Sequence, residues 1–253
     1  MARIISICNQ KGGVAKTTTS TNLCAYLAAM GKYVLLVDLD SQANATVGLG
    51  INIKEGEPSI YHSLIIDHNP ELIIKKTNIF GFDILPSAQE LAGATVELVS
   101  MDERESRLKK SLNSIRTNYD YIIIDCAPSL GLLTINALNA SDKIIIPVQC
   151  EYFALEGLSQ LLKTIELVRE SLNPDLQVLG VLLTMYDRRN QLSNQVLNEV
   201  RKNFPGRVFD AVIPRTVSLA EAPSFGKTIL QFDPGSKAAK AYRLLAEEVI
   251  RLT

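Results

Sequence analysis

Seven short runs of apolar, largely β-branched residues recur along the chain and alternate with segments of helical periodicity. Strands that are apolar throughout need cover on both faces, which is typical of parallel sheets. With helices between successive strands, the economical arrangement is a doubly wound, mostly parallel sheet with right-handed crossovers. We therefore expect an α/β fold with flanking helices. The expected strands are "RIISIC" (3–8), "YVLLVD" (33–38), "FDILP" (82–86), "YIIIDC" (121–126), "KIIIPVQC" (143–150), "LQVLGVLLT" (176–184) and "RVFDAVI" (207–213).

Helical periodicity is clearest over residues 21–30, 155–172 and 192–204. The stretch 52–78 is the least regular, and we expect helical surface insertions there. No repeat, low-complexity segment or long linker interrupts the chain. We therefore predict a single domain over residues 1–253.

The composition, 47% hydrophobic and 21% charged, is that of an ordinary globular protein. No apolar run approaches the roughly 18 residues that span a bilayer, and the residues before Arg3 leave no room for a signal peptide. We expect a cytoplasmic protein whose scattered cysteines are small buried hydrophobes rather than disulfides or metal ligands. These cysteines are Cys8, Cys24, Cys126 and Cys150.

Charge is unevenly distributed along the chain. The net charge is −1, yet residues 180–253 carry 11 Lys and Arg against 7 Asp and Glu, a net of +4. Such asymmetry is weak evidence for an anion-facing surface in the C-terminal part, and chance unevenness on a solvated surface explains it equally well.

Polar segments follow several of the expected strands. Ligands of open parallel sheets bind beyond the carboxyl ends of the strands, so these segments are expected to meet at one site. They are "NQKGGVAK" (9–16), "DLDSQAN" (38–44), "DCAPSLG" (125–131) and "IPRTVSLAEAPSFGK" (213–227).

Loop 9–16 has the composition of a phosphate-binding loop. Its glycines allow successive backbone N–H groups to turn toward one anion, and the following helix adds the positive end of its dipole. Lys16 would reach the β- and γ-phosphates, and the Thr17 hydroxyl would bind Mg²⁺. Asp125, directly after "YIII", stands where such proteins place the acid of the Mg²⁺ shell. A helix cap or a strand-end turn is the alternative explanation for Asp125.

Five segments in family order, spanning residues 4 to roughly 230, resemble the ParA/Soj branch of the deviant-Walker ATPases, relatives of MinD. The resemblance implies a P-loop ATPase that dimerises around Mg-ATP and binds double-stranded DNA without sequence specificity. It also implies a place on the nucleoid and a ParB-type centromere-binding partner that switches the protein off during chromosome or plasmid segregation. The segments are "NQKGGVAKTTT", "VLLVDLDSQANATVGLG", "YDYIIIDCAPSLGLLTINAL", "IIPVQCEYFALEGLSQLL" and "IPRTVSLAEAPSFGKTI".

The resemblance also assigns catalytic roles. Lys11 would reach across the dimer to the phosphates of the other subunit, as an arginine finger does, whereas Lys16 acts within its own subunit. Asp40 is the candidate for positioning the attacking water and belongs with Thr17 and Asp125 to the expected metal site. Asp38 would support Mg²⁺ or the loop. A helix cap is again the alternative for Asp40.

The nucleotide-binding residues implied by the resemblance come from the phosphate loop and from the segment after the last strand. Thr18 would hold the α-phosphate. Thr216 stands where many relatives have Asn, so an amide contact to the adenine is not expected. The full set is Lys11, Gly12, Gly13, Val14, Ala15, Lys16, Thr17 and Thr18 in the loop, with Pro214 and Thr216 at the adenine.

Ala15 departs from the glycine that relatives carry. A left-handed backbone there would cost Ala on the order of 1–2 kcal/mol. A helix-entry conformation would make the methyl nearly free. Because the other catalytic residues are present, we expect an active ATPase that is slow without its partner and is weakened by Ala15.

Basic residues near the C-terminal loops are the candidates for DNA contact: Arg188, Arg189, Arg215 and Lys227. A few charges per monomer give weak phosphate affinity, which a dimer would strengthen. Ser218 stands where some relatives have a further arginine, and a solvated charged turn is the alternative explanation.

Two other functions fit the same fold. A MinD-like membrane-associated ATPase would end in a basic amphipathic helix, whereas this chain ends in "SKAAKAYRLLAEEVIRLT", which indicates a helix packed on its own domain. A small-molecule ligase or kinase should lack the "AEAPS" and "VQCEYFALEGL" segments and have a second substrate pocket.

Overall fold

One eight-stranded sheet organises the computed structural model, which describes residues 1–151 and 154–253. The strand order is β3–β4–β2–β5–β1–β6–β7–β8, and every neighbouring pair is parallel except β3 and β4. The strands are β1 (Arg3–Ile7), β2 (Val34–Leu39), β3 (Lys75–Lys76), β4 (Phe82–Leu85), β5 (Tyr121–Cys126), β6 (Lys143–Gln149), β7 (Gln177–Tyr186) and β8 (Val208–Pro214).

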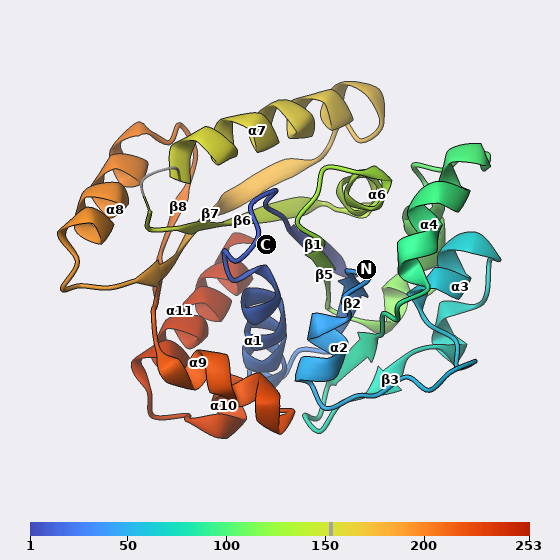
Figure 1. The fold of residues 1–253 in the computed structure, drawn as a ribbon, viewed down its shortest axis with the longest axis horizontal. Helices are drawn as coiled ribbons and strands as arrows, with labels where there is room; N and C mark the ends of the chain where they lie inside the picture. The colour runs from blue at the N-terminus through green and yellow to red at the C-terminus, as the bar shows by residue number, and fades with distance from the viewer. Residues whose placement is uncertain (152–153) are drawn as a thin grey trace.

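Helices cover both faces of this sheet (Figure 1). One apolar core lies between the sheet and α1, α10 and α11, and the other lies between the sheet and α3 to α8. The helices are α1 (Lys16–Ala29), α2 (Asn44–Gly48), α3 (Ile60–Ile65), α4 (Leu91–Glu97), α5 (Arg107–Asn113), α6 (Leu132–Ala140), α7 (Ala154–Ser171), α8 (Gln191–Asn203), α9 (Val217–Glu221), α10 (Ile229–Phe232) and α11 (Lys237–Leu252). Four 3₁₀ turns are η1 (Pro70–Leu72), η2 (Leu98–Ser100), η3 (Arg116–Asn118) and η4 (Ala222–Phe225).

All seven predicted strands are present, and the doubly wound α/β fold is confirmed. The irregular stretch 52–78 holds α3 and η1 as expected, but it also holds the antiparallel edge strand β3, which the sequence did not predict. A two-residue strand made of two lysines has neither apolar alternation nor length to mark it. Residues 152–153 of the motif "IIPVQCEYFALEGLSQLL" lie outside the described residues.

The strand register brings distant acids together at the carboxyl edge of the sheet. Asp38 of β2 is the direct register partner of Asp125 in β5, and Ile7 of β1 pairs with Asp125 on the other side. The phosphate-loop candidate leaves β1 at this point. The sheet therefore places the loop beside both acids, as the positions of the motifs predicted.

The cysteines are buried and free, as expected. Two of them nevertheless meet: the sulfur of Cys8 lies 2.8 Å from that of Cys126, because Cys8 directly follows β1 and Cys126 ends the neighbouring strand β5. None of the helices within the two described ranges is long and apolar enough to cross a bilayer.

Candidate active site

The loop between β1 and α1 contains two residues with a left-handed backbone conformation. Gly13 has φ 73°, and Ala15 has φ 64° and ψ 37°. α1 begins directly after Ala15, whose carbonyl accepts the first helical bond from Thr19 N at 2.9 Å. Left-handed residues in such a loop turn backbone N–H groups toward one side and create an anion-binding concavity at the helix N-terminus.

Ala15 adopts the strained one of the two conformations considered from the sequence. A non-glycine residue in the left-handed region costs about 1–2 kcal/mol, because its Cβ approaches the following carbonyl oxygen. The loop is therefore formed at a local cost that a glycine would avoid.

The two lysines of the loop differ sharply in environment. Lys16 is buried, and its ammonium donates to the carbonyl oxygen of Lys11 at 3.0 Å. Burial lowers the pKa of Lys16 from its ordinary value, and the carboxylate of Asp125 opposes this effect. The side chain of Lys11 is 40% exposed and pairs instead with Glu151 Oε2 at 3.3 Å. Lys16 thus belongs to its own loop, while Lys11 stands at the surface.

Asp125 is a buried acid with one oxygen unused. Ser20 Oγ donates to its Oδ1 at 2.8 Å, whereas its Oδ2 has no hydrogen-bond partner among the described residues. Burial, together with the neighbouring carboxylate of Asp38, raises the pKa of Asp125 to about 7, although the nearby hydroxyls of Thr17 and Ser20 oppose the shift. An orphaned buried carboxylate oxygen is costly unless something else binds it.

These donors fit a magnesium ion that arrives with a nucleotide. Within residues 1–151 and 154–253 no group of three or more His, Cys, Asp or Glu side chains could form a metal cage. Mg²⁺ does not require one, because it is commonly held by one or two carboxylates together with substrate phosphates and waters. The free oxygen of Asp125 and the hydroxyl of Thr17, at the start of α1, are the candidate protein ligands.

Asp38 is fully occupied by the protein itself. Its Oδ2 accepts from the backbone N–H and the hydroxyl of Thr46 at 2.8 and 2.7 Å, and its Oδ1 accepts from Asp40 N at 3.3 Å. Burial raises the pKa of Asp38 to about 6, against these hydrogen bonds. Of the two roles open to Asp38, this geometry favours support of the loop over binding of Mg²⁺.

Asp40 lies on the loop between β2 and α2 and is half-buried. Its Oδ1 accepts from Gln42 N at 3.1 Å, and its backbone carbonyl accepts from Ser87 Oγ at 2.7 Å. Its carboxylate caps a local turn in this state, so the turn role and the catalytic role are compatible.

The segment that was expected to contact the adenine runs beside the start of α1. Pro214 ends β8, and Thr216 lies directly before α9. Residues that follow them share a narrow cavity with Thr17 and Thr18. This cavity is lined by Thr17, Thr18, Thr21, Asn22, Asn44, Gly48, Leu49, Leu219, Ala222, Pro223, Lys227 and Thr228.

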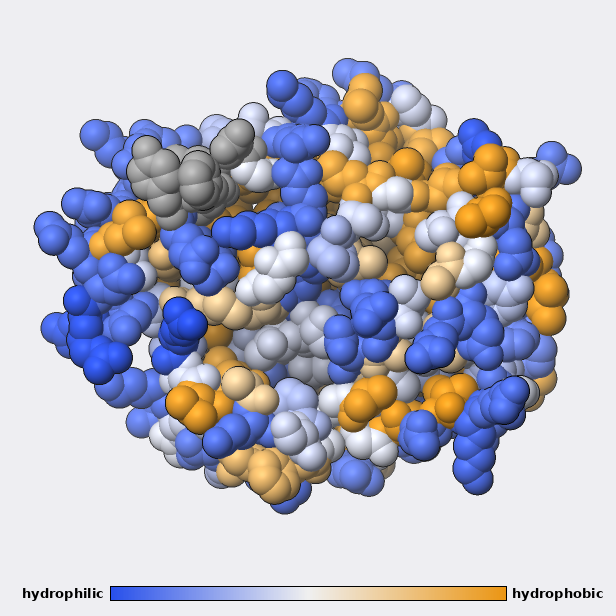
Figure 2. Space-filling model, viewed as in Figure 1, coloured by the Kyte–Doolittle hydropathy of each residue, from blue (hydrophilic) through white to orange (hydrophobic). Residues whose placement is uncertain are grey.

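Three of the four basic candidates gather at the end of β7. Met185, with φ 53°, turns the chain out of the strand, and the exposed Arg188 and Arg189 follow. Arg215 is joined to the same place by its N–H, which donates to Tyr186 O at 3.0 Å. This end of the molecule, next to α8, is mostly hydrophilic (Figures 1 and 2). Lys227 lines the cavity beside α1 instead.

Three residues of the site escaped the sequence reasoning. Glu151 pairs with Lys11, Thr184 Oγ1 donates to Val14 O in the phosphate loop at 3.1 Å, and Ser87 holds the backbone of Asp40. Glu151 and Ser87 lie just after predicted strands, and Thr184 is the last residue of one, at the edge where ligands bind. Position alone could have marked them, but their partners are set by the tertiary fold.

Comparison with known proteins gives this geometry a family. A profile described as an AAA domain matches residues 2–178. The chain is 57% identical over 249 residues to the sporulation initiation inhibitor protein Soj of Bacillus subtilis, covering 98% of each chain. It is 50% identical over 251 residues to the chromosome partitioning protein ParA of Myxococcus xanthus, covering 99% of this chain and 89% of that relative.

The chain belongs to the Soj/ParA family of chromosome-partitioning ATPases. The resemblance drawn from its motifs is thereby confirmed. A Soj/ParA chain should share its fold with other P-loop ATPases, and a structure of MinD from Pyrococcus furiosus matches with a TM-score of 0.81 at 27% identity, covering 100% of each chain. A structure of cobyrinic acid a,c-diamide synthase from Mycobacterium smegmatis, with bound ADP and magnesium, matches with a TM-score of 0.88 at 39% identity, covering 99% of this chain and 95% of that one.

Proposed function

We propose that this Soj/ParA ATPase is a nucleotide-gated switch in which two subunits dimerise around two Mg-ATP molecules. The contrast between its two loop lysines carries the proposal. Lys16 is buried in its own loop, whereas the Lys11 side chain is 40% exposed and its ammonium pairs with the exposed Glu151. The exposure of Lys11 beside the phosphate loop supports a role for it toward a second subunit.

The hydrolytic step follows from the residues around the loop. Water attacks the γ-phosphorus, the bond to the β-phosphate oxygen breaks, and ADP and inorganic phosphate form. Mg²⁺, bound through Thr17, Asp125 and the phosphates, would neutralise charge that develops in the transition state. Lys16 holds the phosphates of its own subunit, Lys11 reaches those of the partner, and Asp40 orients the water.

Magnesium and nucleotide binding are supported from two directions. The orphaned Oδ2 of Asp125 is an acceptor in need of a partner. The Mycobacterium smegmatis protein of the same fold was also solved with a bound ATP analogue and magnesium, at 39% identity. We propose a slow ATPase in the absence of its partner, with the strained Ala15 weakening the loop further.

Non-specific binding of double-stranded DNA is the output that we propose. Arg188, Arg189 and Arg215 lie together at one end of the sheet, and a dimer would present two such sets. Phosphate contacts of this kind release counterions and carry no sequence information. We further propose that a ParB-type centromere-binding protein triggers hydrolysis on the nucleoid, as the family assignment implies.

The membrane alternative is disfavoured by α11. Its apolar face is used within the protein, where Ala238, Tyr242, Leu245 and Val249 are buried against the sheet. A membrane-binding helix would instead have to leave that face free for the lipid. The small-molecule ligase remains the second candidate because of the cobyrinic acid a,c-diamide synthase neighbour.

The decisive experiment is sedimentation with and without DNA in Mg-ATP, Mg-ADP and no nucleotide. The switch requires a dimer and DNA binding in Mg-ATP alone, both lost in Lys16→Ala. A monomer in all three states, or a dimer that never binds DNA, would count against the proposal. Vesicle binding in Mg-ATP would favour the membrane alternative, and ATP turnover only with an added small-molecule acid and amide donor would favour the ligase.

A further inference from the structure

Asp40 lies on an irregular loop, so other residues must fix its position. β2 ends at Leu39 and α2 begins at Asn44. The four residues between them, which include Asp40, belong to neither a helix nor a strand. A group that orients water must be held to within about half an ångström. The question is which side chains hold this loop.

Four residues close a ring of hydrogen bonds around it. Asp40 N donates to Asp38 Oδ1 at 3.3 Å, and Ser87 Oγ donates to Asp40 O at 2.7 Å. Ser87 N donates to Thr46 Oγ1 at 3.0 Å, and that hydroxyl donates to Asp38 Oδ2 at 2.7 Å. The ring therefore grips Asp40 at both its N–H and its carbonyl.

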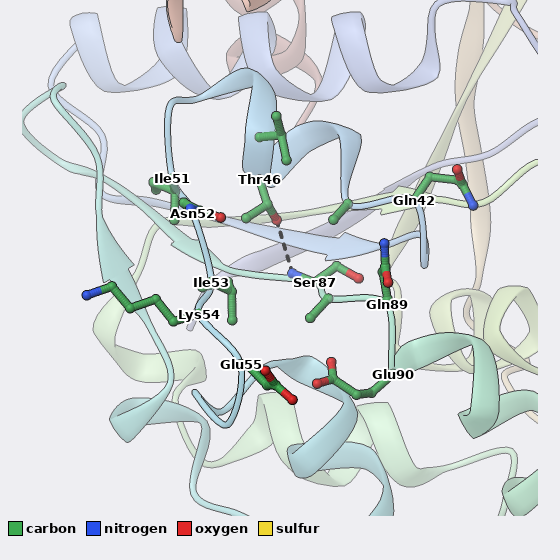
Figure 3. Close-up of a pocket in the computed structure, with 13 residues that line it drawn as sticks. Gln42, Thr46, Ile51, Asn52, Ile53, Lys54, Glu55, Ser87, Gln89 and Glu90 are labelled. Atoms are coloured by element: carbon green, nitrogen blue, oxygen red, sulfur yellow. Dashed lines mark hydrogen bonds between the residues drawn. The ribbon is translucent and has the colours of Figure 1, made fainter.

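The ring joins the consecutive elements β2 and α2 to a segment about 40 residues further along the chain. Asp38 is the penultimate residue of β2, Thr46 lies in α2, and Ser87 follows β4, which pairs with β2. All three are at most 1% exposed, so water does not compete for these bonds. The Thr46–Ser87 bond forms the wall of a groove of about 560 Å³, in which Gln42 and Gln89 also lie (Figure 3).

We propose that Ser87 is a positioning residue for hydrolysis, acting through the backbone of Asp40. The inference rests on the proposed function, because it assumes that Asp40 orients the attacking water. The Asp40 carbonyl accepts from Ser87 Oγ at 2.7 Å and from Ala43 N at 2.9 Å, so Ser87 supplies the side-chain bond that, together with the local turn, fixes the peptide plane after Asp40. Without the Ser87 bond, the Asp40 carboxylate is still present but is no longer held in the orientation that hydrolysis requires. Turnover should therefore fall while nucleotide binding persists.

The test is Ser87→Ala in single-turnover ATP hydrolysis with excess protein. The expected result is a rate lower by about tenfold, since small misplacements of a catalytic group are costly. The dissociation constant for Mg-ATP should stay within about twofold, because the phosphate loop is untouched. Ser87→Thr, which keeps the hydroxyl, should recover most of the rate.

Ser111→Ala is the matched control. Ser111 is also buried, and its hydroxyl makes a 2.6 Å hydrogen bond to Ser63 between α5 and α3. It should lose similar thermal stability to Ser87→Ala but keep the wild-type rate. If Ser87→Ala does not fold, Ser87→Cys gives a variant of nearly equal size with a much weaker donor.

Asp40→Ala separates the two levels of the argument. If Asp40→Ala stops hydrolysis while Ser87→Ala hydrolyses at the wild-type rate, the role of Ser87 is overturned and the proposed function stands. If Asp40→Ala itself hydrolyses normally, both the assignment of Asp40 and that of Ser87 are wrong. If Ser87→Ala and Ser111→Ala lower the hydrolysis rate by the same factor, Ser87 only stabilises the fold and the inference is overturned.

Discussion

Lys11 is tied to Glu151 of its own subunit by an ion pair of 3.3 Å in which both side chains are nearly half exposed. Such a pair contributes at most about 1 kcal/mol to stability, so the lysine can exchange it for another anion at little cost. A phosphate from a second subunit would compete with Glu151 for the same ammonium.

Lys11→Ala should therefore abolish ATP-dependent dimerisation and lower hydrolysis with it, while the melting temperature hardly changes. Sedimentation in Mg-ATP and a thermal melt measure the two effects. Lys75→Ala is a matched control. Lys75 is similarly exposed and pairs with Glu57 at 3.8 Å, and both residues lie outside the phosphate loop 9–16. A Lys11→Ala protein that still dimerises and turns over normally would remove the trans-acting lysine from the mechanism.

Ala15→Gly should stabilise the protein by about 1 kcal/mol. The left-handed backbone costs Ala about 1–2 kcal/mol, which Gly avoids. The greater conformational freedom of Gly in the unfolded chain reduces this gain by about 0.4–1 kcal/mol. In a chain of this size, the melting temperature should rise by about 2–4 °C.

Ala241→Gly, in the middle of α11, provides the comparison for Ala15→Gly. Its backbone is helical, so Gly should destabilise it by about 1 kcal/mol. Opposite signs for the two substitutions are the expected outcome. Equal losses would mean that residue 15 does not adopt the left-handed conformation in solution.

The sheet was predictable because a parallel strand buried on both faces leaves an apolar, β-branched run that few other structures produce. The phosphate loop was predictable because Gly13 and Lys16 lie in sequence beside a strand and a helix. Glu151 and Ser87 were not, because an exposed ion pair and a bond to a backbone carbonyl leave no pattern in the sequence. The sequence also could not decide the conformation of Ala15, because a small residue is compatible with both the left-handed and the helix-entry backbone.

The metal-free protein should become less stable as the pH rises from about 4 to about 7. Folding raises the pKa of Asp125 from its ordinary value of 3.8 to about 7, so the folded state binds a proton that the unfolded chain has released. This contribution is complete below about pH 4 and is lost as the pH passes through 7. The pKa of Asp38, raised to about 6, acts in the same direction.

Asp125→Asn should flatten this dependence, because the amide stays neutral at every pH. Melting temperatures without Mg²⁺ at several pH values give the comparison. Asp175→Asn serves as the control, since Asp175 is exposed and should leave the slope of the wild type unchanged. A wild-type slope of the opposite sign would show that Asp125 is ionised in the metal-free protein.

Glu248→Ala should destabilise the edge of the sheet. β8 is the last strand, and the buried carboxylate of Glu248 in α11 accepts from the N–H groups of Asp210 and Ala211 at 3.0 and 2.8 Å. Removing it leaves two backbone donors poorly satisfied, at a cost of about 1–3 kcal/mol each. Thermal or urea unfolding measures the loss. Its exposed neighbour Glu247 forms a surface pair with Arg243, and Glu247→Ala should cost less than about 1 kcal/mol.

Arg189 offers the sharpest test of the DNA surface, because its charge is partly masked. Its side chain is 91% exposed, and its guanidinium contacts the Asp187 carboxylate at 3.1 and 3.2 Å. Asp187 is an ordinary ionised carboxylate at neutral pH, and the hydrogen bond from Arg189 lowers its pKa further. Asp187 therefore opposes phosphate binding at this turn.

Arg189→Ala should weaken DNA binding equally for all sequences, and Asp187→Asn should strengthen it. Each lost phosphate contact lowers the log-log salt slope by about 0.9, so a symmetric dimer should lose about 1.8. DNA binding in Mg-ATP over a salt series measures both variants, with dimerisation followed in parallel. Arg201→Ala, an exposed arginine in the last turn of α8, is the control and should keep the wild-type slope. Unchanged slopes in Arg189→Ala and Asp187→Asn would place DNA on another face, because a real phosphate contact cannot be removed without releasing fewer counterions.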